Sequence, residues 1–233
     1  MIKTKDGTFT LKSDKYNECY HSSEGALRET LYKHVYPAFE VIKKENIRIL
    51  DICFGLGYNT FASIINRPKN TKLHIISPEL DKELVGSLKD FPYPREFNKI
   101  KHIIKAVSEN FYYEDKWIRV EVIIDDAREV IKSLDRVDIL YQDAFSPKVN
   151  PELWSFEYFK EIKRILKDGI LTTYSVATPI RCALYRLGFR LYTHPYDFIR
   201  KGTIASFKKL DFVEVDFKEK LKRVKCRVIR DKK

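Results

Sequence analysis

Short apolar runs alternate along the chain with longer stretches of helical period. The runs that fit buried strands are residues 47–52, 73–77, 120–124, 137–142 and 170–176. The stretches that fit helices are residues 25–45, 80–89, 101–113, 127–134, 154–166 and 179–187. Pro37 predicts a break or kink within the first of these helices. Strands that alternate with helices indicate βαβ units, so we expect an α/β fold with a mainly parallel sheet.

The two ends of the chain depart from this alternation. Residues 1–24 alternate weakly around Asp6-Gly7, a hairpin-type turn, and predict a short β-ribbon followed by a loop. The strands expected after Gly188 are residues 190–193, 204–208, 212–217 and 223–229. We therefore expect one domain over residues 1–233. Its parts are an N-terminal extension or cap (1–45), a core (46–207) and basic C-terminal antiparallel strands (208–233).

Charge narrows the choice of partner. The 233 residues carry a formal net charge of +11, which favours an anionic partner, either nucleic acid or an acidic membrane surface. The alternative is a protein that is simply rich in lysine. No apolar run approaches the roughly 20 residues that span a bilayer, and the first residues lack the apolar stretch of a signal peptide. We expect a cytoplasmic protein that binds nucleic acid and no membrane.

The cysteines give no sign of a disulfide framework or a metal site. Cys19, Cys53, Cys182 and Cys226 are scattered, without a C-x-x-C pair and without a histidine at metal-ligand spacing. We expect four reduced, partly buried thiols and no bound metal.

An acidic residue stands at the end of each of the first four predicted strands. These residues are Asp51, Glu79, Asp126 and Asp143. In an open parallel sheet, ligands bind outside the carboxyl ends of the strands. Each acid taken alone has an ordinary interpretation as a helix N-cap. Four in succession predict a shared ligand site.

The turn after the first strand indicates the kind of ligand. Gly55 and Gly57 let the backbone approach a ligand closely, although a plain strand-to-helix turn has the same appearance. Thr60 stands where a dinucleotide-binding motif has its third glycine. A carboxylate before the turn, at Asp51, also disfavours a pyrophosphate. It suits a ligand with an ammonium and a sulfonium, such as S-adenosyl-L-methionine.

This ligand assigns a role to each of the other acids. We expect Glu79 to accept hydrogen bonds from both ribose hydroxyls. Asp126 is placed to accept from the adenine amine, beside the Ala127 backbone amide. Asp143 lies where the methyl group would be delivered and suits an amine acceptor. It would accept the amine's proton in a dry site, or stabilise positive charge developing on nitrogen.

The last sixteen residues are strongly basic. Nine Lys and Arg residues between Lys218 and Lys233 oppose only Glu219 and Asp231, and they alternate with apolar residues. This pattern predicts a strand with a basic face. Such a strand either follows a phosphate backbone or is a plain charged edge strand.

Three stretches carry a resemblance to a known family. Residues 20–30 (YHSSEGALRET) are similar to its Y-F-S-x-x-x-G-L-x-E-T segment. Residues 54–59 (FGLGYN) are similar to its F-G-T-G-x-N turn. Residues 143–154 (DAFSPKVNPELW) are close to its D-G-F-x-P-x-x-N-P-x-x-W signature. In these stretches the chain resembles the methyltransferase module of MnmC-type enzymes, which act on the wobble uridine of certain tRNAs.

The resemblance implies a Rossmann-like class I fold that uses S-adenosyl-L-methionine. It implies N-methylation of 5-aminomethyl-2-thiouridine in tRNA to 5-methylaminomethyl-2-thiouridine, with Asp143 as the catalytic carboxylate. The residues that it implies for the cofactor site are Tyr20, Glu29, Gly55, Gly57, Asn59, Glu79, Asp126 and Ala127. Cys53 and Ala144 replace glycines of the family pattern. The flavin oxidase domain of bifunctional relatives has no counterpart in this sequence, so we expect no flavin and a substrate that arrives as the free amine.

Two other hypotheses use the same fold. An aminopropyltransferase or a small-molecule amine N-methyltransferase also places a carboxylate near an amine, although an acidic pocket for a polycation is at odds with the net charge of +11. A non-catalytic RNA-binding module predicts that replacing Asp143 leaves the cellular role intact.

Overall fold

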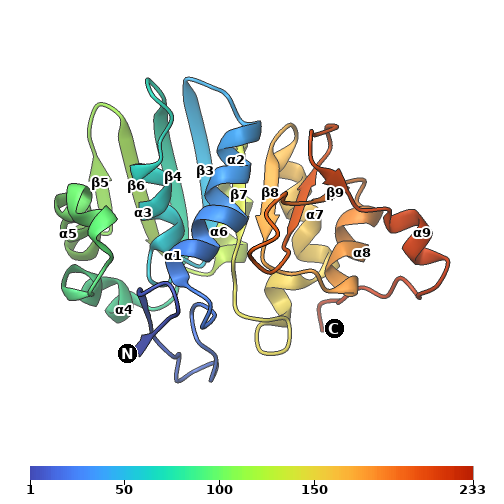
Figure 1. Ribbon diagram of the computed structural model, residues 1–233, viewed down its shortest axis with the longest axis horizontal. Coiled ribbons are helices and arrows are strands. Elements are labelled where there is room, and N and C mark those ends of the chain that lie inside the picture. The colour runs from blue at the N-terminus through green and yellow to red at the C-terminus, as the bar shows by residue number, and fades with distance from the viewer. Residues whose placement is uncertain (233) are drawn as a thin grey trace.

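A nine-stranded mixed sheet forms the centre of the computed structural model, which describes residues 1–232 (Figure 1). Its strand order is β11-β9-β10-β8-β7-β3-β4-β6-β5. The five strands from β8 to β6 run parallel, and β5, β9, β10 and β11 pair antiparallel with their neighbours. The strands of this sheet are β3 (Asn46–Ile52), β4 (Lys72–Glu79), β5 (Tyr112–Glu114), β6 (Ile118–Ile124), β7 (Ile139–Gln142), β8 (Ile170–Thr173), β9 (Arg190–Thr193), β10 (Thr203–Ser206) and β11 (Val213–Glu214).

Apolar side chains on both faces of the central strands produce two separate cores. In β3, Ile47 and Ile49 join one core, whereas Leu50 and Ile52 join the other. This two-sided burial explains why the parallel strands are continuous apolar runs in the sequence. The elements on the first face are α1 (Ala26–Glu29), the π-helix η1 (Thr30–Val35), α2 (Tyr36–Val41), α3 (Tyr58–Ile65), α4 (Lys82–Ser87), η2 (Leu88–Asp90), η3 (Arg95–Ile100) and α5 (Lys101–Asn110). Those on the second face are α6 (Ala127–Ser133), η4 (Pro151–Trp154), α7 (Phe156–Leu166), α8 (Thr178–Arg186) and α9 (Phe217–Leu221).

The α/β class and the mainly parallel sheet predicted from the sequence are confirmed. The N-terminal ribbon is also present, as β1 (Ile2–Lys3) paired with β2 (Phe9–Thr10) around the predicted turn. Two predicted helices differ from the structure. The stretch 101–113 leaves the helix at Phe111, whose left-handed backbone (φ 57) begins the antiparallel edge strand β5. The stretch 25–45 is helical only as far as Val41 and contains the π-helix η1, which continues directly into α2. Pro37 is the second residue of α2, so it lies where the helix changes from π to α geometry and does not end it.

The predicted strand over residues 223–229 is wrong. After α9 the chain continues without regular structure and folds back over α7 and α8. Its alternating apolar residues pack against the second core, among them Cys226, Val228 and Ile229. The Phe156 backbone amide donates to the Ile229 carbonyl (2.9 Å), and Arg128 pairs with Asp231 through two hydrogen bonds. Lys233, part of the predicted basic strand, lies outside the described residues.

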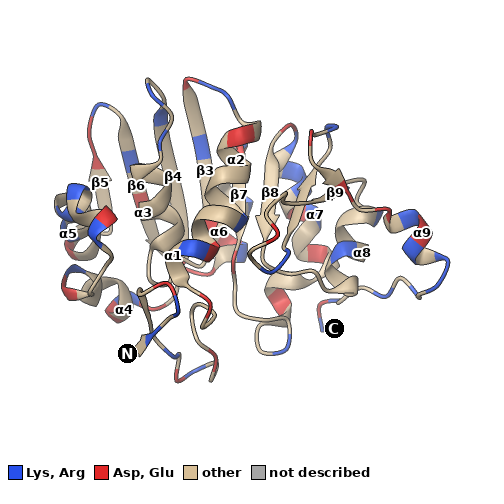
Figure 2. Ribbon diagram, viewed as in Figure 1, with Lys and Arg blue, Asp and Glu red and all other residues tan. Residues whose placement is uncertain are grey.

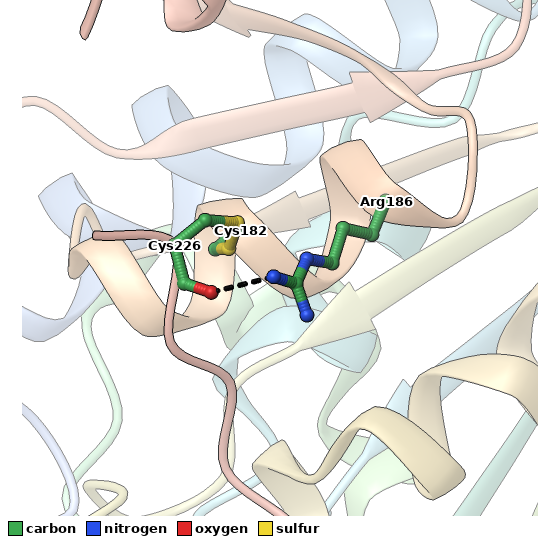
Figure 3. The surroundings of a disulfide bond; sticks show 3 residues. All are labelled: Cys182, Arg186 and Cys226. Atoms are coloured by element: carbon green, nitrogen blue, oxygen red, sulfur yellow. Dashed lines mark hydrogen bonds between the residues drawn. A yellow bond between two sulfur atoms is a disulfide. The ribbon is translucent and has the colours of Figure 1, made fainter. Parts of the chain in front are cut away.

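The prediction of four free thiols is also wrong. Cys182 on α8 and Cys226 form a disulfide, with their Cα atoms 5.6 Å apart (Figure 3). Arg186 donates to the Cys226 carbonyl (2.8 Å) one turn further along α8. The separation of 44 positions between the two cysteines carries no spacing signal, because the pairing depends on how the tail folds back. Cys19 and Cys53 are free.

Candidate active site

A pocket of about 1260 Å³ opens at the carboxyl ends of β3, β4, β6 and β7. The segments that directly follow these strands form one wall of the pocket. Residues of the segment 13–22 and of η1 supply the opposite wall. Two hydrogen bonds join the walls: the Ser146 hydroxyl and backbone amide donate to the Glu18 carboxylate (2.6 and 3.1 Å). The predicted convergence of strand ends therefore creates a site that the N-terminal segment completes.

Gly55 forms the tight part of the turn after β3. Its φ is +53°, and an added Cβ would lie 3.0 Å from the Tyr20 ring. Its backbone amide donates to Glu79 Oε2 (2.8 Å), so the turn and the end of β4 are fixed together. Gly57 has φ +69°, but it does not line the pocket; a Cβ there would lie 2.5 Å from the Phe61 ring. The second glycine thus serves helix packing rather than the predicted direct ligand contact.

Glu79 faces the pocket with its carboxylate held by backbone amides. Its Oε1 accepts from the amides of Leu80 (2.8 Å) and Asp81 (3.0 Å). A carboxylate has about four acceptor positions, so three amide contacts leave capacity for a ligand hydroxyl. Asp126 caps α6 by accepting from the Arg128 amide (2.7 Å), and both Asp126 and Ala127 line the pocket. For Asp126 the cap and the predicted ligand-facing position therefore coexist.

Asp51 does not reach the pocket, contrary to its predicted place among the ligand-contacting residues. Its side chain is fully buried behind Asn59, and it accepts from the Thr60 hydroxyl (2.8 Å) and the Asn59 amide (3.3 Å). Burial raises the pKa of Asp51 to about 8; the charge of Asp143 acts in the same direction, and the hydrogen bonds from Thr60 and Asn59 oppose it. Thr60 is thus a hydrogen-bond donor to this acid at the position where a dinucleotide motif needs glycine.

Asp143 lies on the pocket wall directly after β7. Its side chain keeps 19% of its exposure, and its Oδ2 accepts from the Asn59 amide (2.9 Å). Its Oδ1 lies 3.7 Å from His34 Nε2. Burial raises the pKa of Asp143, but the neighbouring imidazoles of His34 and His21, when protonated, and the Asn59 amide together lower it by more, so the pKa of Asp143 lies below its ordinary value. Asp143 is therefore a carboxylate at neutral pH.

His34 is a pocket residue that the sequence did not reveal. It lies on η1 with 2% of its side chain exposed, and its Nδ1 forms a 2.8 Å hydrogen bond with Thr172 Oγ1 on β8. In the sequence it is one polar position within a helical pattern. Its partners are 138 and 109 positions away, so nothing local marked it.

The remaining predicted residues lie on the N-terminal wall. Glu29 pairs with the buried Lys33 one turn later and accepts from the Ser22 amide (3.3 Å). The Tyr20 ring lies 5.0 Å from that of Phe145. Burial and the charge of Glu79 raise the pKa of Tyr20 to about 12, so it is a neutral donor.

The donor and acceptor groups fit S-adenosyl-L-methionine. Asn59 Oδ1 is a buried acceptor without a hydrogen-bond partner among residues 1–232, beside the ionised Asp143, and suits an ammonium group. Glu79 provides a carboxylate for ribose hydroxyls. Gly55 provides a close backbone approach that a Cβ would obstruct. Within the same described range, no group of three or more His, Cys, Asp or Glu residues is arranged to hold a metal ion, and no helix is long and apolar enough to cross a membrane.

Comparison with known proteins gives concordant matches. The family model described as S-adenosyl-L-methionine-dependent methyltransferase matches residues 96–208. The crystal structure of MnmC2 from Aquifex aeolicus superposes with a TM-score of 0.85 at 34% identity, over 99% of this chain and 78% of that one. A probable spermidine synthase from Corynebacterium glutamicum (TM-score 0.60, 14% identity, 89% and 81% coverage) shares the fold.

Curated relatives are longer than this chain. An uncharacterized protein of Methanocaldococcus jannaschii is 32% identical over 217 residues, which are 91% of this chain and 60% of that protein. The bifunctional tRNA 5-methylaminomethyl-2-thiouridine biosynthesis protein MnmC of an Azoarcus species is 30% identical over 202 residues, 78% of this chain and 32% of that protein. The chain thus spans less than two thirds of each of these relatives.

Proposed function

The chain belongs to the MnmC2-type S-adenosyl-L-methionine-dependent methyltransferases, and from this premise we propose that it methylates the aminomethyl nitrogen of a wobble uridine in tRNA. The reaction converts 5-aminomethyl-2-thiouridine to 5-methylaminomethyl-2-thiouridine. Its cytoplasmic location, where tRNAs serve translation, is part of this proposal. So is the arrival of the substrate as a free amine, which requires no flavin.

One observation supports the amine substrate above all: the ionised Asp143 beside Asn59 on the pocket wall. When bound, S-adenosyl-L-methionine supplies an electrophilic methyl group. Glu79, Asp126 and the Gly55 turn are the residues that would hold it. The Asp143 carboxylate orients the incoming nitrogen and accepts its proton, or stabilises the positive charge that develops on it. A carboxylate serves a nitrogen nucleophile in this way, whereas a carbon nucleophile has no ammonium to orient.

Charge and the lining of the pocket mouth support tRNA as the partner. The net charge is +11, and Lys15, Lys82, Arg200 and Lys201 line the pocket beside its acids. Figure 2 shows further Lys and Arg on α9 and along the segment after it. Among the described residues 202–232 none lines the pocket, so tRNA contacts by this part of the tail would fall outside the reacting centre. An RNA that neutralises several of these cations loses affinity steeply as salt rises.

The test is transfer of a labelled methyl group to two tRNA preparations that differ only in the wobble aminomethyl group. We expect label in the aminomethyl tRNA alone, recovered as the methylaminomethyl nucleoside after digestion. Asp143→Asn, which keeps the shape of the side chain, should reduce the rate by at least a hundredfold and retain cofactor binding measured by calorimetry.

Two results would contradict the proposal. Equal labelling of both tRNAs would reject the aminomethyl substrate. Full activity of Asp143→Asn would reject the role of the carboxylate and leave the non-catalytic RNA-binding hypothesis open. The aminopropyltransferase and small-molecule hypotheses gain only the shared fold from the spermidine synthase comparison; they predict labelling or transfer with free amines in place of tRNA.

A further inference from the structure

We infer that His34, acting through Asp143, takes up the proton that the substrate ammonium releases before methylation. This inference rests on the proposed amine methylation. His34 is a positioning residue in this scheme, because Asp143 stands between it and the substrate nitrogen. The evidence is geometric: a nearly inaccessible imidazole directs one ring nitrogen at the carboxylate and anchors the other to the sheet.

The need for a second proton acceptor follows from the charges. An alkyl ammonium has a pKa of roughly 10 and must lose a proton to become a nucleophile. An aspartic carboxyl ordinarily has a pKa of about 3.9, far below that of an alkyl ammonium, so Asp143 alone does not hold this proton well. A neutral imidazole has an unprotonated ring nitrogen that can accept the proton from the carboxyl group. Passing the proton onward restores the carboxylate that stabilises the methylated nitrogen.

The steps balance as follows. An N–H bond of the substrate ammonium breaks, and the proton binds an Asp143 oxygen. The freed nitrogen lone pair forms the N–CH₃ bond while the methyl–sulfur bond of the sulfonium donor breaks and its electron pair stays on the sulfur of the departing thioether. The product leaves as a secondary ammonium. The proton on Asp143 passes to His34 Nε2, giving an imidazolium and regenerating the carboxylate, and is finally released to solvent. One proton is released for each methyl group transferred, and no further reactant is needed.

The surroundings of His34 favour this role over a purely structural one. Thr172 on β8 fixes the ring through Nδ1, which leaves Nε2 facing Asp143. The 3.7 Å between Nε2 and Oδ1 exceeds a direct hydrogen bond. A small movement on substrate binding, or one bridging water, would connect them. On β7 the Tyr141 ring packs edge-on at 5.6 Å and excludes solvent from the other side.

The other titratable groups near His34 either pair with one another or lie further from Asp143 than His34 does. Glu29 and Lys33, on the helical turn before His34, pair with each other. Asp51 lies behind Asn59 and does not line the pocket. His21, on the N-terminal wall, packs its ring edge-on against Tyr58 at 4.9 Å, and burial lowers its pKa. His34 is therefore the nearest imidazole for relaying a proton from Asp143.

The kinetic test compares wild type, His34→Gln and the control His102→Gln. Glutamine retains a hydrogen bond to Thr172 but cannot accept a proton, and His102 is exposed on α5. We expect His34→Gln to lower kcat about a hundredfold with an unchanged KM for the cofactor, and His102→Gln to match wild type. In wild type kcat should fall at low pH as an imidazole becomes protonated, and this acidic limb should disappear in His34→Gln. Imidazole added to His34→Ala should restore the rate.

A measurement independent of activity completes the design. The Asp143 carboxyl, followed by carbon NMR, should titrate at a higher pH in His34→Gln than in wild type, because burial would then act without its main opposing partner. Parallel pH profiles for wild type and His34→Gln, or an unshifted Asp143 titration, would overturn the inference. So would a loss of rate that imidazole fails to restore. If wild type does not methylate aminomethyl tRNA, the proposed function fails instead, and the NMR result still decides whether the two residues are coupled.

Discussion

The disulfide between Cys182 and Cys226 closes a long loop, and removing it should destabilise the fold measurably. A cross-link across 44 residues restricts the unfolded chain by about 4 kcal/mol at room temperature if loop-closure entropy dominates. The tail retains other anchors, including the Arg128–Asp231 pair and the buried Phe217. We therefore expect the double variant Cys182→Ala/Cys226→Ser to fold, with a free energy of unfolding lower by up to that amount.

Guanidinium unfolding with and without reductant measures this difference. Oxidised wild type should unfold at a higher denaturant concentration than the double variant, and reductant should bring wild type to the variant's midpoint. Cys19→Ser, at an exposed free cysteine, is the matched control and should follow wild type under both conditions. Four titratable thiols in the unfolded, unreduced protein would refute the pairing. A midpoint shared by oxidised wild type and the double variant would refute the loop-closure reasoning.

Three further predictions concern the Gly turn and its acids. Glu79→Gln should weaken cofactor binding at least tenfold by calorimetry, because a charged acceptor for the ribose is lost; unchanged affinity would remove Glu79 from the site. Gly57→Ala should lower the free energy of unfolding by about 2 kcal/mol or more, since its φ is +69° and a Cβ would meet Phe61, whereas Gly86→Ala, with open space around it, should not. Burial raises the pKa of Asp51 from 3.8 to about 8, so between these values the folded state holds a proton that the unfolded state has lost. Stability should fall with rising pH across that window by up to about 1.4 kcal/mol per unit, and Asp51→Asn should flatten this slope in urea titrations.

Local patterns in the sequence predicted the sheet and most of the core-side pocket wall. Buried parallel strands leave long apolar runs, and the residues that follow them converge whatever the details of packing. Glu79, Asp126 and Asp143 therefore reached the pocket as expected. Asp51 did not, because a side chain at the last inward position of β3 lies one layer below the wall. Burial of an acid at a strand end is not visible in a one-dimensional pattern.

Tertiary contacts determined what the sequence could not show. His34 acquires its position from η1, whose wider turn has no recognised sequence signature here, and from Thr172 on a distant strand. The disulfide and the path of the tail depend on packing against α7 and α8, which overrode the alternating pattern that predicted a strand. In each case the deciding contact joins residues far apart in the chain.

The wall contributed by the N-terminal segment has a consequence for how the protein is made. Glu18 contacts Ser146, His34 contacts Thr172, and Arg28 donates to the Phe198 carbonyl, separations of 128, 138 and 170 residues. The first part of the site to leave the ribosome must therefore wait until nearly all of the sheet has been synthesised. Until those residues have been synthesised, this segment can pack against α3, as His21 does on Tyr58, but the opposite wall is incomplete. The enclosed ligand site therefore forms late in folding. A nascent chain that stops before β8 would contain the Gly turn and Asp143 but no enclosed pocket.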